Sequence, residues 1–281
     1  MNGDRKIRNN QLTNCFCLMI RQQAGADDSV IENAILRQAA TSWPSTKARL
    51  HGLTENVLRS RKVNIFSIAT ESTVASQADA AASLYSLAAL LELITVVCES
   101  CGDFMTNRFA KDVWPAIARN LGFIIQSKSH QSKSFLKATD LHEESILLET
   151  ARDISDSERQ LIVSMLDCLG RVYRVLNLSD DILSAGAFAL LPFLDSRHFG
   201  QVIGEKAMLA MKRLADANCA ALWRPLLQLM GCEIPPFPMG LTVLDQLITV
   251  GTESSSDDTV LHGKAAELLT YINCLPEQAI F

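Results

Sequence analysis

Three short motifs in the sequence carry residues that could perform chemistry, and each of them is incomplete. Residues 142–146 (His-Glu-Glu-Ser-Ile) begin like the His-Glu-x-x-His motif of zinc proteases, but an isoleucine replaces the second histidine. The Gly-Lys pair at 263–264 lacks the earlier glycine and the following Ser or Thr of a phosphate-binding loop. Cys98 and Cys101 have zinc-like spacing, but no other cysteine pair or histidine cluster completes four ligands. We therefore predict a protein that is not an enzyme and has no cofactor and no metal site.

The composition is that of a folded, helical chain. Of its 281 residues, 48% are hydrophobic and 20% are charged, whereas disordered chains contain fewer apolar residues. Only 8 prolines and 13 glycines are present, which disfavours a β-rich fold with many turns. The formal net charge of −5 argues against general nucleic-acid binding. This charge is uneven, because residues 1–62 hold ten Lys and Arg against five Asp and Glu.

The chain carries no pattern typical of secretion or of membrane insertion. The apolar run Cys15–Ile20 is too short for the core of a signal peptide, so we expect reduced cysteines and a cytoplasmic location, with the nucleus also open. Ala78–Val97 has about the length of a membrane span, but it contains Asp79 and Glu92 and lacks basic flanks. We predict that this segment is a buried helix and that the protein has no membrane partner.

Helical periodicity dominates the chain, and no window shows the alternation of a β-hairpin. Ser155 and Ser179 each precede acidic residues, which is typical of a helix N-terminus. The polar segments Ser127–Asp140 and Glu253–Asp258 are predicted to be loops. The predicted helices are Asp28–Ala40, Ser45–Arg59, Ala78–Cys98, Asp103–Gln126 with a break near Asp112, Ser155–Leu176, Ser179–Leu194, Gly200–Ala215, Asp216–Met230, Met239–Val250 and Asp257–Asn273.

These helices are predicted to form a stack of pairs. Apolar helices with an internal proline recur at Pro115, Pro192 and Pro225, which suggests curved first helices of repeated units. Ser179–Ala215 is the clearest unit. We predict an all-α fold, a HEAT/armadillo-like superhelix built from antiparallel helix pairs. Residues 1–75 would be a helical N-terminal segment, and residues 76–281 the solenoid, with a polar surface insertion at about 127–150.

One stretch resembles a known family. Residues 99–115 are similar to a segment near the carboxyl end of the Tel-two-interacting protein one family, the large HEAT-repeat subunit of the Triple-T (TTT) co-chaperone complex. A looser likeness in helix order extends over about 80–250, and family members are several times longer, so we expect a carboxyl-terminal portion. The residues that carry the resemblance are Glu99-Ser100-Cys101-Gly102-Asp103-Phe104, Arg108-Phe109 and Lys111-Asp112-Val113-Trp114-Pro115.

The resemblance implies a set of candidate residues in this stretch. Gly102 is expected to end one helix and Asp103 to cap the next, while Phe104, Trp114 and Pro115 are interpreted mainly as structural. The candidates for partner binding are Arg108 and Lys111, because a charge on a helix surface has little role in a core, together with Asp112.

The function implied by the resemblance is that of a non-catalytic adaptor. Family members work with the Tel-two protein and a second HEAT-like subunit. Together they bring phosphatidylinositol-3-kinase-related kinases, among them the mTOR and ATM kinases, to the ninety-kilodalton heat-shock chaperone. A generic HEAT-repeat scaffold, such as a karyopherin-like transport adaptor, is the alternative that the sequence leaves open.

Overall fold

The regular structure of the chain is helical throughout the part that can be described. A computed structural model describes residues 28–66, 74–138, 154–223, 225–226 and 259–275. Four short segments connect or extend the α-helices: the 3-10 helices η1 (Gly102–Met105), η4 (Leu191–Leu194) and η5 (Cys219–Leu222), and the π-helix η2 (Phe109–Val113). The α-helices are α2 (Asp28–Phe66), α3 (Val74–Cys101), α4 (Thr106–Arg108), α5 (Trp114–Ala138), α6 (Asp156–Val172), α7 (Asp180–Leu190), α8 (Ser196–Phe199), α9 (Gln201–Ala217) and α12 (Thr259–Asn273).

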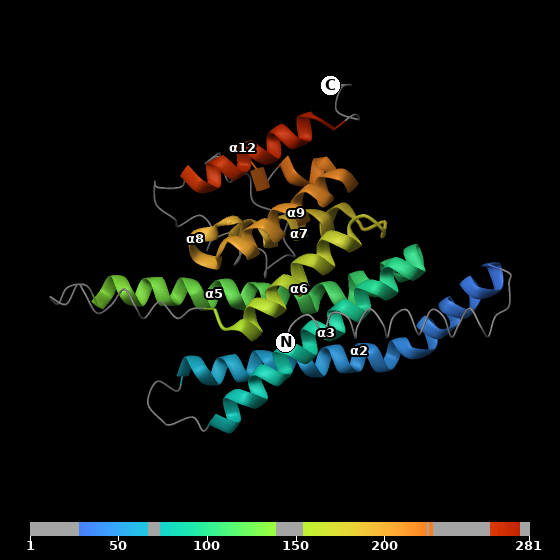
Figure 1. The fold of residues 1–281 in the computed structure, drawn as a ribbon, viewed down its shortest axis with the longest axis horizontal. Helices are drawn as coiled ribbons and strands as arrows, with labels where there is room; N and C mark the ends of the chain where they lie inside the picture. The colour runs from blue at the N-terminus through green and yellow to red at the C-terminus, as the bar shows by residue number, and fades with distance from the viewer. Residues whose placement is uncertain (1–27, 67–73, 139–153, 224, 227–258, 276–281) are drawn as a thin grey trace.

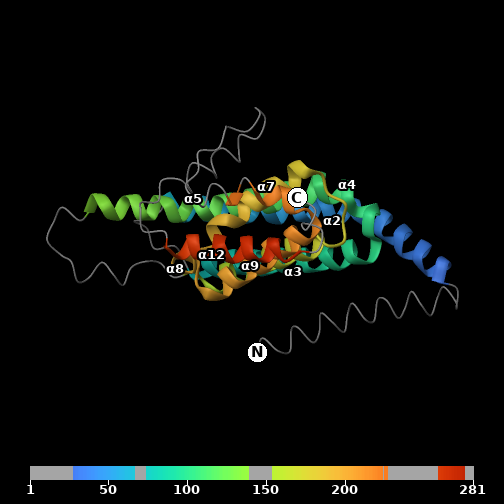
Figure 2. The same cartoon turned by 90° about the horizontal axis from the view of Figure 1, so that it is seen from above.

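The helices stack in two layers. In one layer α2 contacts α5 and α5 contacts α7, and in the other α3, α6, α9 and α12 follow one another, each in contact with the next. Figure 1 shows this stack rising from α2 to α12, and Figure 2 shows α2, α5 and α7 in one row with α3, α9 and α12 in the other. The layers are joined where α2 packs on α3 and α7 on α9. The predicted all-α helical solenoid is confirmed.

Helix α3 supplies the central part of the core. Its buried residues recur every three or four positions, at Leu84, Leu87, Leu91, Ile94 and Cys98, and the helix packs between α2 and α6. The helical run Ala78–Gln126, which begins within α3, is long and apolar enough to cross a membrane. In this fold, 44% of its most apolar window is buried. Contacts with two neighbouring helices are typical of a core helix in a helical stack.

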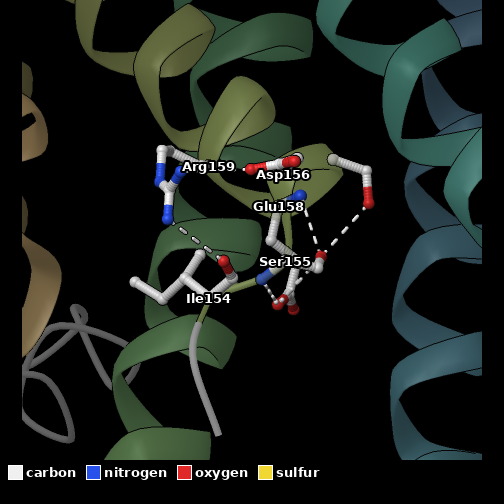
Figure 3. A network of polar contacts seen from close by, with 6 residues as sticks. Ile154, Ser155, Asp156, Glu158 and Arg159 are labelled. Carbon is white, nitrogen blue, oxygen red and sulfur yellow. Dashed lines mark hydrogen bonds and ion pairs between the residues drawn. The ribbon is translucent and has the colours of Figure 1, made fainter.

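A capping box begins α6, at the serine where the sequence predicts a helix N-terminus (Figure 3). The Ser155 hydroxyl accepts a hydrogen bond from the backbone N–H of Glu158 at 3.2 Å, and the Glu158 carboxylate accepts one from the backbone N–H of Ser155 at 3.4 Å. Asp156 adds an ion pair with Arg159 at 3.1 Å. Ser179 occupies the N-cap position of α7 as expected, but its side chain makes no capping bond.

The predicted break between two N-terminal helices is wrong. Helix α2 runs without interruption through Pro44, where the sequence suggests one helix ending at Ala40 and another beginning at Ser45. A proline removes one backbone hydrogen bond from a helix, but buried side chains on both sides of it offset that cost. Trp43 and Leu50 are buried while Pro44 is exposed, so the proline ring lies on the outer face of the helix.

The sequence predicts a loop at Ser127–Asp140. This prediction is wrong for the residues up to Ala138, because α5 continues to that residue. This stretch contains no Gly or Pro, and helix extension costs little once the preceding turns have formed. The predicted helix Asp216–Met230 is wrong in its described part, because α9 continues to Ala217 and the 3-10 helix η5 then covers Cys219–Leu222. Residues 139–153 and 227–230 lie outside the described residues, as do the predicted helix Met239–Val250 and the acidic loop at 253–258. Helix α9 itself extends to Ala217, beyond the predicted boundary.

Two of the three internal prolines change the type of helix. Helix α7 ends at Leu190, and Pro192 lies in the 3-10 helix η4 that follows. Pro115 is the second residue of α5, directly after the π-helix η2. A proline cannot donate to the carbonyl one turn before it, which permits such changes of hydrogen-bond pattern. The expected unit Ser179–Ala215 is otherwise present as α7, η4, α8 and α9.

Tyr173 and Gly186 form a tight contact between the end of α6 and α7. The Tyr173 side chain is buried, and its hydroxyl has no hydrogen-bond partner among the described residues. A Cβ at position 186 would lie 2.1 Å from this hydroxyl oxygen. Glycine at 186 is therefore required by the tyrosine that packs against it.

We expect Gly186→Ala to lower the free energy of unfolding by about 1–3 kcal/mol, because the methyl group overpacks this contact. Tyr173→Phe alone should be nearly neutral, since it removes a buried hydroxyl that has no partner. The double variant should recover most of the loss, because the nearest atom to the new methyl would then be ring carbon Cζ at 3.1 Å. Urea unfolding of the four proteins measures this; equal losses in the single and double alanine variants would contradict it.

Candidate partner-binding surface

The segment that carries the family resemblance forms the junction between α3 and α5. Helix α3 ends at Cys101, and Gly102 adopts a φ of +51°, in the left-handed region that favours glycine. Space around Gly102 is open, so the backbone conformation rather than crowding favours glycine there. The chain then passes through η1, α4 and η2 before α5 begins at Trp114.

Asp103 does not cap the helix that follows it, contrary to the expectation from sequence. The N-cap position of η1 is Cys101, and no side chain makes a capping bond there. The Asp103 carboxylate instead accepts a hydrogen bond from the backbone N–H of Asn177, at 3.3 Å. Asn177 lies just beyond α6, so Asp103 connects the α3–α5 junction to the next part of the stack.

Phe104 and Arg108 interact with each other. The Arg108 guanidinium lies 4.1 Å from the centre of the Phe104 ring, and it donates a hydrogen bond to the Phe104 carbonyl at 2.8 Å. Arg108 therefore already has partners within its own chain. Its role in partner binding stays a prediction.

Trp114 is part of the core at the start of α5. It is 9% exposed and lies beside the fully buried Val113 and Phe109 of η2. Phe104 is partly buried and packs against the same core. The exposed Pro115 follows directly, so the core residue and the surface residue of this motif are adjacent in sequence.

Asp112 connects η2 to the long helix α2. Its carboxylate accepts a hydrogen bond from the Trp43 indole N–H at 2.9 Å and forms an ion pair with the Lys47 ammonium at 2.8 Å. Burial raises the pKa of this carboxyl group, but the bonds from Lys47 and Trp43 outweigh that effect, so the pKa lies below its usual value of 3.8. The side chain is 13% exposed. Sequence reasoning offers no signal for this contact, because its partners are 65 and 69 positions away.

A groove of about 260 Å³ lies beside this contact, between α2 and the start of α5. Among the residues predicted as sites, Lys111, Asp112 and Pro115 line it, whereas the Gly102–Phe104 segment and Arg108 do not. The other lining residues were not predicted as site residues, mainly because the sequence offered no functional motif in α2. The groove is lined by Lys47, Leu50, His51, Thr54, Lys111, Asp112, Pro115, Ala116 and Arg119.

Cations dominate the lining of the groove. Lys47, Lys111 and Arg119 contribute positive charge against the single carboxylate of Asp112. Arg119 is bonded to Glu55, which lies on α2 and whose pKa is lowered chiefly by that hydrogen bond. The surface can therefore receive an anionic group, with apolar contact from Leu50, Pro115 and Ala116.

The zinc-like cysteine pair gives no metal centre in the described part of the chain, where no group of three or more potential ligands gathers. Burial raises the pKa of Cys98 above its usual range, and it raises that of Cys168 to about 11. Burial therefore keeps these thiols protonated at neutral pH.

Asp112→Asn tests the link between α2 and η2. We expect a loss of about 1 kcal/mol at pH 7, because the Lys47 ion pair and part of the Trp43 bond disappear. The folded-state pKa is depressed, so this stabilisation is present at neutral pH and is lost as the pH falls below about 4. Urea unfolding at pH 7 and pH 3 should therefore show a smaller difference between variant and parent at pH 3. Asp79→Asn, an exposed change on α3, is the control, and a constant difference at both pH values would contradict the assignment.

Trp114→Ala should reduce the free energy of unfolding by about 3–5 kcal/mol, since it leaves a large cavity in the core. Trp223 is a matched control, because it is 42% exposed. Trp223→Ala should cost less than about 1 kcal/mol. Thermal unfolding of both variants measures the contrast, and an unchanged melting temperature for Trp114→Ala would place this ring outside the core.

Comparison with known proteins agrees with this architecture. The family model described as the TTI1 C-terminal TPR domain matches residues 81–223, just over half of the chain. The match extends from α3 to the residue after η5, so it contains the α3–α5 junction, α6, α7 and α9. No curated protein and no solved structure matches the chain significantly. Both TPR and HEAT repeats are stacked two-helix units, and the family description assigns the TPR type. The chain belongs to the TTI1 C-terminal TPR domain family.

Proposed function

We propose that this chain acts as a non-catalytic scaffold and adaptor of the TTT complex, and that it supports the maturation and stability of phosphatidylinositol-3-kinase-related kinases. The observation that carries the proposal is the family match over residues 81–223, which spans most of the described stack. A helical solenoid exposes a long surface relative to its core, which suits it to binding proteins.

Two features of the surface support a binding role. The groove between α2 and α5 presents cations beside apolar side chains. Several large apolar side chains are also exposed, among them Leu93 on α3 and Val202 and Leu209 on α9. Exposed apolar side chains take part in protein interfaces where they form a contiguous patch.

The proposed partners are those of the resembling family. They are the Tel-two protein, the second HEAT-like subunit, kinases of the mTOR and ATM type, and the ninety-kilodalton heat-shock chaperone. Such an adaptor would act in the cytoplasm, and also in the nucleus where these kinases work. No nucleic acid and no membrane has a part in the proposed role.

A tagged pull-down of this chain from its own cells, analysed by mass spectrometry, tests the proposal. We expect recovery of the Tel-two protein above the level of a tag-only control, with the second subunit and the large kinases in smaller amounts. Trp114→Ala should lose these partners together, because the interface requires the folded stack. Enrichment of nuclear-transport factors without the Tel-two protein would contradict the proposal and favour a transport adaptor.

A further inference from the structure

We propose that the groove between α2 and α5 binds an acidic segment of a protein partner, with a Glu or Asp side chain entering it. This inference deepens the proposed scaffold function and rests on it. The groove is defined by its cationic residues Lys47, Lys111 and Arg119, with Thr54 and Pro115 beside them.

The charge of the groove is opposite to that of the chain. The whole protein carries a formal charge of −5, yet three cations and one carboxylate line this groove. Local charge of one sign steers oppositely charged partners and selects among them. Lys111 is exposed and has no bonded partner among the described residues, so its ammonium is available to an incoming carboxylate.

The paired cations also retain capacity for a ligand. The Lys47 ammonium has three N–H donors, and one contact with Asp112 at 2.8 Å leaves others available. The Arg119 guanidinium has five donors, and its one bond among the described residues is to Glu55. A carboxylate in the groove would therefore add hydrogen bonds without breaking the contacts that hold α2 against α5.

Thr54 supplies an independent observation. The residue is 1% exposed, lines the groove, and carries a hydroxyl with no hydrogen-bond partner among the described residues. Buried polar groups are almost always hydrogen-bonded, and one without a partner beside a groove indicates a missing water or ligand. The hydroxyl can donate to a carboxylate oxygen, directly or through one water molecule.

The size of the groove fits a side chain rather than a cofactor. Its volume of about 260 Å³ lies below the range of roughly 300–1,000 Å³ that is typical of small-molecule sites. Leu50, Pro115 and Ala116 offer apolar contact for the methylene groups of a glutamate. A peptide that places one or two acidic side chains in the groove satisfies both the charge and the volume.

The test uses the purified full chain and a fluorescein-labelled hexaglutamate peptide, followed by fluorescence anisotropy at low salt. We expect saturable binding that weakens as salt is added, and at least about tenfold weaker binding of a hexaglutamine peptide. Lys111→Glu should weaken hexaglutamate binding by about tenfold or more. Arg49→Glu is the matched control, since it makes the same charge change on α2 outside the groove and should have little effect.

Thr54→Val separates the groove from general electrostatics. It removes the hydroxyl but keeps the shape and the charge, so we expect about three- to tenfold weaker peptide binding with an unchanged or higher melting temperature. Equal effects of Lys111→Glu and Arg49→Glu, or full binding by Thr54→Val, would overturn the proposed site. Equally tight binding of a labelled oligothymidine would also overturn it in favour of a general anion surface.

The same variants separate failure of this inference from failure of the proposed function. If the purified chain does not bind hexaglutamate but still recovers the Tel-two protein from cells, the groove assignment is wrong and the scaffold function stands. If the chain binds the peptide through Lys111 and Thr54 but recovers no TTT subunit, the groove assignment stands and the scaffold function is wrong.

Discussion

Helix α3 is the element on which the rest of the structure depends. It is apolar around most of its circumference, so it needs a neighbouring helix on more than one side to be stable in water. Helices α2 and α6 provide this cover, and their own remaining apolar faces are covered in turn by α5 and α9. Each helix therefore requires the next one. This requirement produces a two-layer stack rather than a closed globule.

The α3–α5 junction determines which side chains face α2 and therefore which residues form the groove. Gly102 ends α3 with a positive φ, and the π-helix η2 then brings Asp112 against Trp43 and Lys47 of α2. The same contact positions Lys111 and Pro115 on one side of a groove and α2 on the other. Within the segment 99–115 that carries the family resemblance, Trp114 and Asp112 thus contribute to packing between helices. Lys111 and Pro115 of the same segment are exposed.

Local signals in the sequence were sufficient for the fold class and for most helices. Periodic apolar residues predict α3, α6 and α9, and Ser155 before acidic residues predicts the start of α6, because these features act within a few turns. Pro44 misleads, since the burial of Trp43 against a distant segment outweighs the loss of one hydrogen bond. The groove could not be predicted, because it is created by residues of α2 and α5 that are remote in sequence and carry no motif.

Zero-length carbodiimide crosslinking of the isolated complex, followed by mass spectrometry, tests whether the groove between α2 and α5 contacts an acidic partner residue. This reagent joins a lysine amine to a carboxylate only when the two are in contact. We expect a bond from Lys111, with or without Lys47, to an Asp or Glu of a TTT subunit, and none from the partly exposed Lys206, which pairs with Asp167 of its own chain at 2.9 Å. Crosslinks from Lys206 to a partner, with Lys111 recovered unmodified, would contradict it and place the interface on the layer of α3, α6 and α9.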